Sequence, residues 1–529
     1  MTKELTGFTK NAGKWLAFLR KAIFGDIWMA AETLLAAIFF LLGQEVIGVV
    51  VFVYLISFKL VISDDSLCAF LSFLLVGLMV LRLYDSFDRF MSLKFVMGVP
   101  AVFGVFFHFI FYRKRPYKGG LTKGYLAISF ALAFGGLFSI PVSHYFSGTA
   151  LYYTYGLGFG MLLLYSLMVR GVNPRGEYDI REYVAKTAFF CALYSIFIIA
   201  LQYLANLSLI DEGWKFSVEK LSSLSNNLST TVLLTMPFLF YLSRKGGARG
   251  GVAFAVGVLE GLASVLSLSR GGIIFDTAMC LFLIGFTLWK DRRGRRRNVA
   301  ILSVILVAIL AVYLSFRKEI NDLFREGIVA TSPLIQLAFF AAALFAIVAT
   351  AYFYYLCRLR SRRKRRVHVA ILASLILVFF AIFLAEFSRL ESILVRADSY
   401  RGGMMAIAVD NFKVFPFFGT GIGYRGLRGV YENKEGMFGC YHCLPVQVVG
   451  SMGLFGAAAY LYMFRERIRL LKRSKDKEFA ATVLFSYVGL LWISLVNPGI
   501  FCPVVYGLQL TVYFIAAERT GDFPKNPEK

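Results

Sequence analysis

The chain has few of the residues that most often build metal and disulfide sites. It contains only four histidines and seven cysteines, and most of the cysteines lie inside apolar runs: Cys68, Cys191, Cys280 and Cys357. A thiol in such a run acts as a small hydrophobe, so we expect no disulfide framework. The sequence also lacks a G-x-S-x-G, an HExxH or a P-loop pattern, and it lacks carboxylate pairs at glycosidase-like spacing on the predicted outer face. Hydrolysis by those routes is therefore unsupported.

Charge is scarce as well, because only 17% of the 529 residues are charged, whereas 58% are apolar and Phe alone contributes 54. With a mean hydropathy of +0.68, the chain cannot be a disordered tail or a solvated polar filament. Apolar runs of about 17–25 residues follow one another, and each is long enough to cross a bilayer as a helix. None shows the two-residue alternation of a barrel strand. We therefore predict an all-α polytopic membrane protein with about 14–16 transmembrane helices and one long extracytoplasmic loop.

Basic residues outnumber acidic ones by 57 to 32, which gives a net charge of +25. They gather in short bursts between apolar runs rather than on one amphipathic face, so membrane lipids, and not nucleic acid, are the expected partner. With both chain ends in the cytoplasm, the positive-inside rule places the largest bursts on the cytoplasmic side. These bursts are 113–118, 290–297, 358–366 and 465–477.

This topology divides the chain into five segments. They are a basic cytoplasmic N-terminus (1–26), a transmembrane helical domain (27–387), an extracytoplasmic arginine-rich catalytic loop (388–442), C-terminal transmembrane helices (443–517) and a cytoplasmic tail (518–529). The loop is the longest segment outside the membrane, and loops of that length usually serve function. It carries seven basic residues on the face where topology disfavours them: Arg389, Arg396, Arg401, Lys413, Arg425, Arg428 and Lys434. A glycine-rich turn at 419–423 follows Pro416 and indicates a sharp bend or backbone close to a ligand.

Two outer residues stand out as candidates for chemistry. His442 lies where the loop re-enters the membrane, so its neutral imidazole could accept a proton inside a cavity walled by cations; an ordinary packed histidine is the alternative. Arg270 stands between two apolar runs, where a guanidinium normally has an anionic partner or a polar cavity. Gly271 and Gly272 beside it would let a phosphate approach closely. We favour an anion ligand over a simple interfacial charge, because planar guanidinium groups suit diphosphates.

Other polar groups have more ordinary interpretations. Cys440 and Cys443 flank His442 and could hold a metal with further ligands, but a local disulfide or two unremarkable thiols is the simpler reading. Asp64 and Asp65 are expected to be solvated turn residues rather than metal ligands. His108 is expected to be a packed or lipid-facing imidazole.

Three blocks of sequence, in order, resemble the O-antigen ligase and O-antigen polymerase (Wzy-like) superfamily of polytopic membrane glycosyltransferases. The first joins NNLSTTVLLTMPFLFYL (226–242) to LSLSRGGII (266–274). The second is RGGMMAIAVDNFKVFPFFGTGIG (401–423), with an arginine, an amphipathic helix and Pro-x-x-Gly-x-Gly. The third is HCLPVQVVGSMGLFG (442–456), with a histidine, a glutamine five residues later and Gly-x-x-Gly. One residue departs from the family, since Cys443 stands where asparagine is common.

The resemblance implies an inverting, metal-independent transfer without cofactors from an undecaprenyl-diphosphate-linked glycan donor. The acceptor would be a glycan, a lipid or another cell-envelope molecule. Arg270 and Arg401 match arginines that hold the diphosphate, and His442 matches the general base. Possible supporting residues are Arg396, Arg425, Arg428, Gly419, Gly421 and Gln447. The implied location is the bacterial cytoplasmic (inner) membrane, with the active site on the extracytoplasmic face.

Two classes of function compete with this interpretation. A transporter or flippase for lipid-linked glycans would also place arginines in a membrane cavity, although the sequence shows no internal repeat of the kind that transporters usually have. A structural partner in glycan export is the third possibility. Ligase and polymerase activity share the same motifs, so the sequence leaves that choice open.

Overall fold

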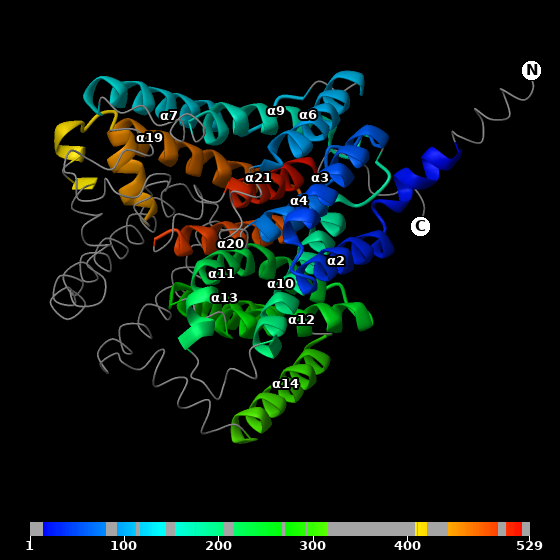
Figure 1. Cartoon of the computed structure of the whole chain (residues 1–529). Coiled ribbons are helices and arrows are strands. Elements are labelled where there is room, and N and C mark those ends of the chain that lie inside the picture. The colour runs from blue at the N-terminus through cyan, green and yellow to red at the C-terminus, as the bar shows by residue number, and fades with distance from the viewer. Residues whose placement is uncertain are drawn as a thin grey trace, which may run out of the picture. The chain divides into compact units, whose positions relative to one another are not determined.

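The structure is a computed structural model of the whole chain (Figure 1). The residues it describes are 14–80, 92–112, 117–143, 154–174, 176–205, 215–266, 270–291, 294–315, 408–409, 411–419, 443–495 and 504–520. Helices make up all the regular secondary structure in these ranges, which confirms the predicted all-α fold. The chain divides into two compact units, which we call unit 1 and unit 2 and describe separately. The division of the chain by membrane topology stays a prediction.

Unit 1 comprises 1–118, 166–339 and 509–529. Its helices are α2 (Asp26–Leu41), α3 (Glu45–Ile62), α4 (Phe70–Val80), α6 (Lys94–Phe111), α10 (Ile180–Ala205), α11 (Lys215–Ser243), α12 (Gly247–Leu266), α13 (Arg270–Lys290) and α14 (Arg295–Ser315). Unit 2 comprises 119–165 and 340–508. It holds α7 (Thr122–Ser143), the π-helix η2 (Thr154–Gly160), α19 (Leu444–Arg473) and α20 (Lys477–Ile493). Two further helices, α9 (Met161–Gly171) and α21 (Val504–Arg519), have residues in both units.

Several helices are long and apolar enough to cross a membrane. Within the described residues these are α3, α6, the Ile180–Leu201 part of α10, and α19. A fifth candidate is the pair Lys14–Ala22 and Asp26–Leu41, which is bent by 65°. Shorter apolar helices occur at Phe70–Val80, Gly156–Gly171 and Asn227–Ser243. The sequence predicts about 14–16 spans, and that number stays a prediction. Two of the apolar runs on which it depends, at 334–357 and 367–387, lie outside the described residues.

The core of unit 1 is a packed group of helices, α10 to α13, that lie side by side in Figure 1. From Leu228 to Tyr241 every residue of α11 is buried. A helix that is apolar on all sides is stable only when neighbours cover it all round, and α10, α12 and α13 do so here. This segment belongs to the first of the three sequence blocks described above.

A second group in unit 1, α2, α3, α4 and α6, encloses a buried ion pair. The Lys59 ammonium contacts the Glu32 carboxylate, and both side chains are almost fully buried. Ser72 extends the network, since it accepts from Lys59 at 2.9 Å and donates to Glu32 at 2.8 Å. Trp28 also donates its indole N–H to Glu32. Each charge is thus compensated by its neighbours.

Breaking that ion pair on one side should destabilise unit 1 strongly. We expect Lys59→Met to lower the free energy of unfolding by about 3–5 kcal/mol, because it leaves the Glu32 charge buried and uncompensated. The double variant Glu32→Gln with Lys59→Met should recover most of that loss, since no charge remains. Thermal unfolding of the purified protein in detergent measures both changes. Equal destabilisation of the single and double variants would contradict this account.

The turn at 63–67 corrects one sequence prediction. Asp65 is not solvated but is 4% exposed. Its carboxylate accepts hydrogen bonds from the backbone N–H of Leu67 (2.8 Å) and of Asn173 (3.1 Å), and from the Tyr178 hydroxyl (2.7 Å). Asp65 thereby holds Asn173 and Tyr178, which lie between α9 and α10, close to the start of α4. The sequence shows two adjacent aspartates but not the distant donors that make burial of one of them favourable.

His108 is packed inside α6, as expected. The ring is fully buried, with Nδ1 at 3.0 Å from the carbonyls of Leu60 and Ser63 and Nε2 at 3.2 Å from the Ser66 hydroxyl. Its hydrogen bonds join α6 to the end of α3 and to the turn that follows it. Among the described residues, these contacts give His108 a structural role.

Tyr178 should make a pH-dependent contribution to stability. Burial, and then the Asp65 carboxylate beside it, raise the pKa of the Tyr178 hydroxyl well above its ordinary value. The contribution is therefore fully present below the unfolded-state pKa of about 10 and is lost as the pH rises through the folded-state pKa. We expect Tyr178→Phe to cost about 1–2 kcal/mol at pH 7, because Asp65 loses a donor, and to flatten the alkaline loss of stability. Unfolding midpoints between pH 7 and alkaline pH, compared with the wild type, check both expectations.

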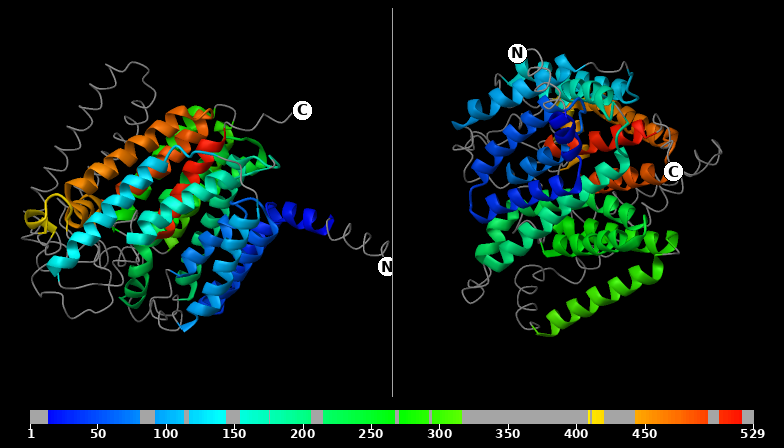
Figure 2. Two further views of the ribbon diagram at one scale, coloured as in Figure 1. Left: turned by 90° about the horizontal axis from the view of Figure 1, so that it is seen from above. Right: turned by 90° about the vertical axis from the view of Figure 1, so that its right-hand side faces the viewer.

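In unit 2, α7 runs along α19 (Figure 2). Small residues allow the close approach. A Cβ on Gly124 would lie 2.6 Å from the Met463 sulfur, and one on Gly135 would lie 3.0 Å from the carbonyl oxygens of Phe418 and Ser451. Asp476 is the N-cap residue of α20, and its carboxylate accepts hydrogen bonds from the N–H groups of Glu478 and Phe479, both at 2.9 Å. These contacts fix α19, which carries the third sequence block.

Candidate functional site

The main irregularity of unit 2 is a break inside α19. Gly453 has φ 61° and ψ −156°, a conformation open to glycine and strained for other residues. The helix therefore stops after Met452 and starts again, which frees backbone groups that a continuous helix would satisfy. A break at membrane depth is tolerated only where other protein groups or a polar cavity satisfy the freed groups.

The segment 411–419 supplies the missing partners (yellow in Figure 1). The carbonyl of Pro416 accepts from the N–H of Leu454 at 2.8 Å, and the carbonyl of Phe417 accepts from the N–H of Phe455 at 2.9 Å. These bonds join the Pro-x-x-Gly stretch of the second sequence block to the Gly-x-x-Gly stretch of the third.

Two glycines make this contact sterically possible. Gly419 has φ 69°, and a Cβ there would lie 2.3 Å from the Met452 nitrogen; a Cβ on Gly453 would lie 2.6 Å from the Pro416 oxygen. Three aromatic rings close the junction, since Phe134 of α7, Phe418 and Phe455 have mutual centroid distances of 5.8–5.9 Å. We call this arrangement of 411–419, the Gly453 break and α7 the turn–helix junction.

Gln447 and Cys443 lie in the half of α19 that precedes the break. Gln447 is fully buried and donates from Nε2 to the Ser451 hydroxyl at 2.7 Å. Cys443 is a buried free thiol at the start of the helix, so it is not in a disulfide. The next residue, Leu444, donates its N–H to the Ser494 carbonyl at 2.7 Å and ties the helix start to the end of α20.

The structure describes only part of the predicted site. His442, Arg396, Arg401, Arg425, Arg428 and Gly421 lie outside the described residues. Arg270 begins α13 in unit 1, and its side chain is likewise outside them. Gly419 and Gln447 are both in unit 2; Gly419 contacts Ser451 and Met452 just before the α19 break, and Gln447 lies in the same half of that helix. Within the described residues no group of three His, Cys, Asp or Glu side chains could hold a metal ion.

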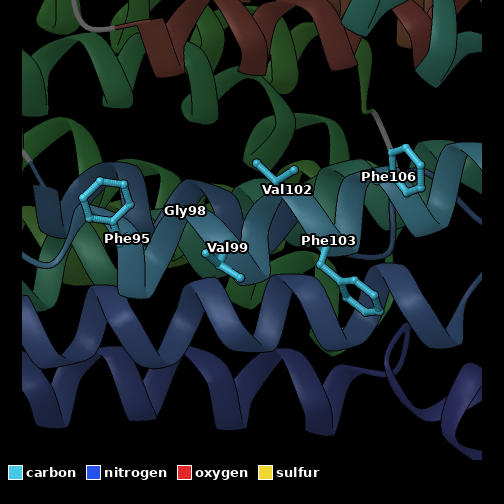
Figure 3. A pocket seen from close by; sticks show the side chains of 6 residues that line it. All are labelled: Phe95, Gly98, Val99, Val102, Phe103 and Phe106. Carbon is cyan, nitrogen blue, oxygen red and sulfur yellow. The ribbon is translucent and has the colours of Figure 1, made fainter.

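The exposed side of α6 forms a separate, wholly apolar surface. A shallow groove of about 470 Å³ lies along it and is lined by Phe95, Gly98, Val99, Val102, Phe103 and Phe106 (Figure 3). Apart from Gly98, these residues have side chains that are at least 58% exposed, and α6 is one of the candidate membrane spans. Exposed aliphatic and aromatic groups on such a helix suit contact with lipid chains.

Sequence reasoning missed several residues that the structure makes prominent. It noted the Gly-x-x-Gly pattern but not that Gly453 breaks a helix, and no local signal separates a helix-packing glycine from one with positive φ. It did not single out Glu260 and Asp276, which are both fully buried. An acidic residue inside an apolar run was the available signal.

The fold and the site together define an all-helical protein with several helices long and apolar enough to span a membrane. Comparison with protein-family models, with curated proteins and with solved structures finds no match.

Proposed function

We propose that this protein is a membrane glycosyltransferase that transfers or polymerises a glycan from an undecaprenyl-diphosphate-linked donor on the outer face of the bacterial cytoplasmic membrane. The observation that supports it best is the turn–helix junction. Two blocks that resemble the O-antigen ligase and polymerase superfamily, at 401–423 and 442–456, are joined there by backbone hydrogen bonds in the same unit.

The junction also fixes the two ends of the segment that carries the proposed base. Gly419 contacts the backbone of Ser451 and Met452, and Cys443 begins the same helix. Eight residues of α-helix separate Cys443 from Ser451, or about 12 Å along the axis. Gly419 and Cys443 are therefore held near each other, and the chain between them includes Arg425, Arg428 and His442.

The proposed chemistry needs only the residues of the chain. Arg270 and Arg401 bind the diphosphate oxygens and offset the charge that grows on the leaving group. His442 removes the proton from the acceptor hydroxyl, whose oxygen attacks the anomeric carbon from the side opposite the diphosphate. The bond from the anomeric carbon to the diphosphate oxygen breaks, undecaprenyl diphosphate leaves, and the configuration inverts. Because the diphosphate is already a good leaving group, the enzyme mainly positions the reactants and screens charge.

Reconstitution tests this proposal. The full-length protein in liposomes, supplied with a defined undecaprenyl-diphosphate oligosaccharide and an acceptor, should release undecaprenyl diphosphate and form a glycosidic product. We expect Arg270→Ala and Arg401→Ala each to lower the rate by about 10²–10³-fold, the effect of losing one donor to a developing charge. Lys413→Ala is the matched control, because Lys413 is an exposed cation of the same loop. Wild-type activity in both arginine variants would contradict the assigned roles.

A transporter or flippase for lipid-linked glycans is the second candidate, and the break in α19 favours it. Broken helices commonly form substrate sites near the bilayer midplane of transporters. In that case a fluorescent lipid-linked oligosaccharide would cross reconstituted vesicles without any covalent product. Transfer without such flux would support the glycosyltransferase instead.

A further inference from the structure

Two acidic side chains are buried in the helix packing of unit 1. Glu260 of α12 and Asp276 of α13 are both fully buried. Among side chains that the structure describes, no basic group forms an ion pair with either. They interact electrostatically with each other, so they belong to one polar region inside the α11–α13 packing.

Hydroxyl groups of α11 and α12 surround the two carboxyls. Thr235 donates to Glu260 Oε1 at 2.5 Å, and Ser264 donates to Asp276. Ser229 of α11 interacts with Asp276. The Ser229 hydroxyl is fully buried, and although it is close enough to Asp276 to interact with it, the two groups do not meet the distance and angle of a hydrogen bond.

Among the described residues, each carboxyl also keeps one oxygen that forms no hydrogen bond of normal geometry. Glu260 Oε2 and Asp276 Oδ1 are buried and accept or donate no hydrogen bond among the described residues. A buried polar atom left in this state costs free energy, and a buried carboxylate without a cation costs far more. Two carboxylates, two donating hydroxyls and the Ser229 hydroxyl form a set of oxygen ligands, which is what a small hard cation prefers.

We propose that Glu260 and Asp276, with the hydroxyls of Thr235, Ser264 and Ser229, form a buried binding site for a monovalent cation, Na⁺ or a proton. The site is independent of the proposed glycan transfer, since none of its five ligands is a residue assigned to that reaction. A bound cation neutralises one of the two buried negative charges, which lowers the cost of burying the pair, and it ties α11, α12 and α13 together.

Among the side chains that the structure describes, the other titratable groups that interact with the pair are two thiols and a phenol. Cys191 of α10, Cys280 of α13 and Tyr513 of α21 each interact with Glu260. A thiol and a phenol do not neutralise a carboxylate. Arg270 lies on α13 six residues before Asp276, and its side chain is outside the described residues. The labelling experiment below shows whether Asp276 carries a proton.

Carbodiimide labelling of the purified full-length protein in detergent tests the proposal. Dicyclohexylcarbodiimide adds to a protonated carboxyl group in apolar surroundings, with the proton passing to nitrogen and the acyl group then shifting to give a stable acylurea. We expect labelling at Glu260 or Asp276, located by peptide mass spectrometry. If the site takes Na⁺, NaCl should suppress the label while choline chloride at equal ionic strength does not. If it takes only a proton, the label should fall with rising pH and ignore NaCl.

Thermal unfolding provides the second measurement. For a sodium site, NaCl should raise the Tm of the wild type in a saturable way, because the cation binds the folded state. Glu260→Gln and Asp276→Asn should lose that rise, or, for a proton site, should flatten the fall of Tm with pH. Asp291→Asn is the matched control, because Asp291 follows directly after α13 and Arg297 already lies 3.8 Å from its carboxylate. An unlabelled wild type whose Tm responds to neither NaCl nor pH differently from the variants overturns the proposal, and the wild-type result decides even if a variant fails to fold.

Discussion

Replacing His442, the proposed general base, with alanine should lower the kcat of the proposed glycan transfer by about 10²–10⁴-fold, the range for losing a general base. A base acts in the transition state and contributes little to donor binding, so kcat and kcat/KM should fall together. Release of undecaprenyl diphosphate from a defined donor in liposomes measures both quantities.

Cys443→Ala is the control for that experiment, because it alters the adjacent side chain at the start of α19 without removing the imidazole. Its rate should stay close to that of the wild type. Purified His442→Ala protein should keep the wild-type Tm. A folded His442→Ala variant that transfers glycan at the wild-type rate would show that another group accepts the proton.

Gly453→Ala should have a large effect on the stability of unit 2. The new Cβ would lie 2.6 Å from the Pro416 oxygen and from backbone atoms of Phe417, which cannot move as a flexible side chain does. Strain at φ 61° alone costs about 1–3 kcal/mol, and the clash adds to it. We therefore expect a loss of about 3 kcal/mol or more in the free energy of unfolding, measured by thermal or denaturant unfolding in detergent.

Gly156→Ala is the matched control, since a Cβ at Gly156 of η2 meets nothing within 4 Å. It should leave the Tm nearly unchanged. Gly419→Ala should resemble Gly453→Ala, because both substitutions separate 411–419 from α19. If Gly453→Ala is as stable as the wild type, α19 is a continuous helix and the turn–helix junction does not exist.

The junction gives the activity measurement a second use. If the proposed transfer depends on the close packing of the second and third sequence blocks, a stability loss that opens the junction should lower activity even though His442 and the arginines remain. Partial unfolding of the junction at intermediate temperature should therefore inactivate Gly419→Ala before it unfolds completely.

The sequence by itself determined the helical class and the apolar character of the chain. The length and apolar character of a run are local properties, so the apolar runs at 46–63 and 95–112 can be recognised from the sequence alone, and they correspond to α3 and α6. The position of Arg270 at a boundary between helices was also readable, since α13 begins at that residue. Local chemistry also led to the expectation of an outer loop with a Gly-rich turn.

The tertiary structure decided what the polar residues do. Asp65 is buried because Asn173 and Tyr178, more than a hundred residues away, donate to it. Gly453 can break α19 because the carbonyls of Pro416 and Phe417 accept the N–H groups that follow the break. Glu260 and Asp276 share a polar region because α12 and α13 pack together. In each case the free energy depends on a partner distant in the chain, and no local pattern of residues specifies which partner folding will bring into contact.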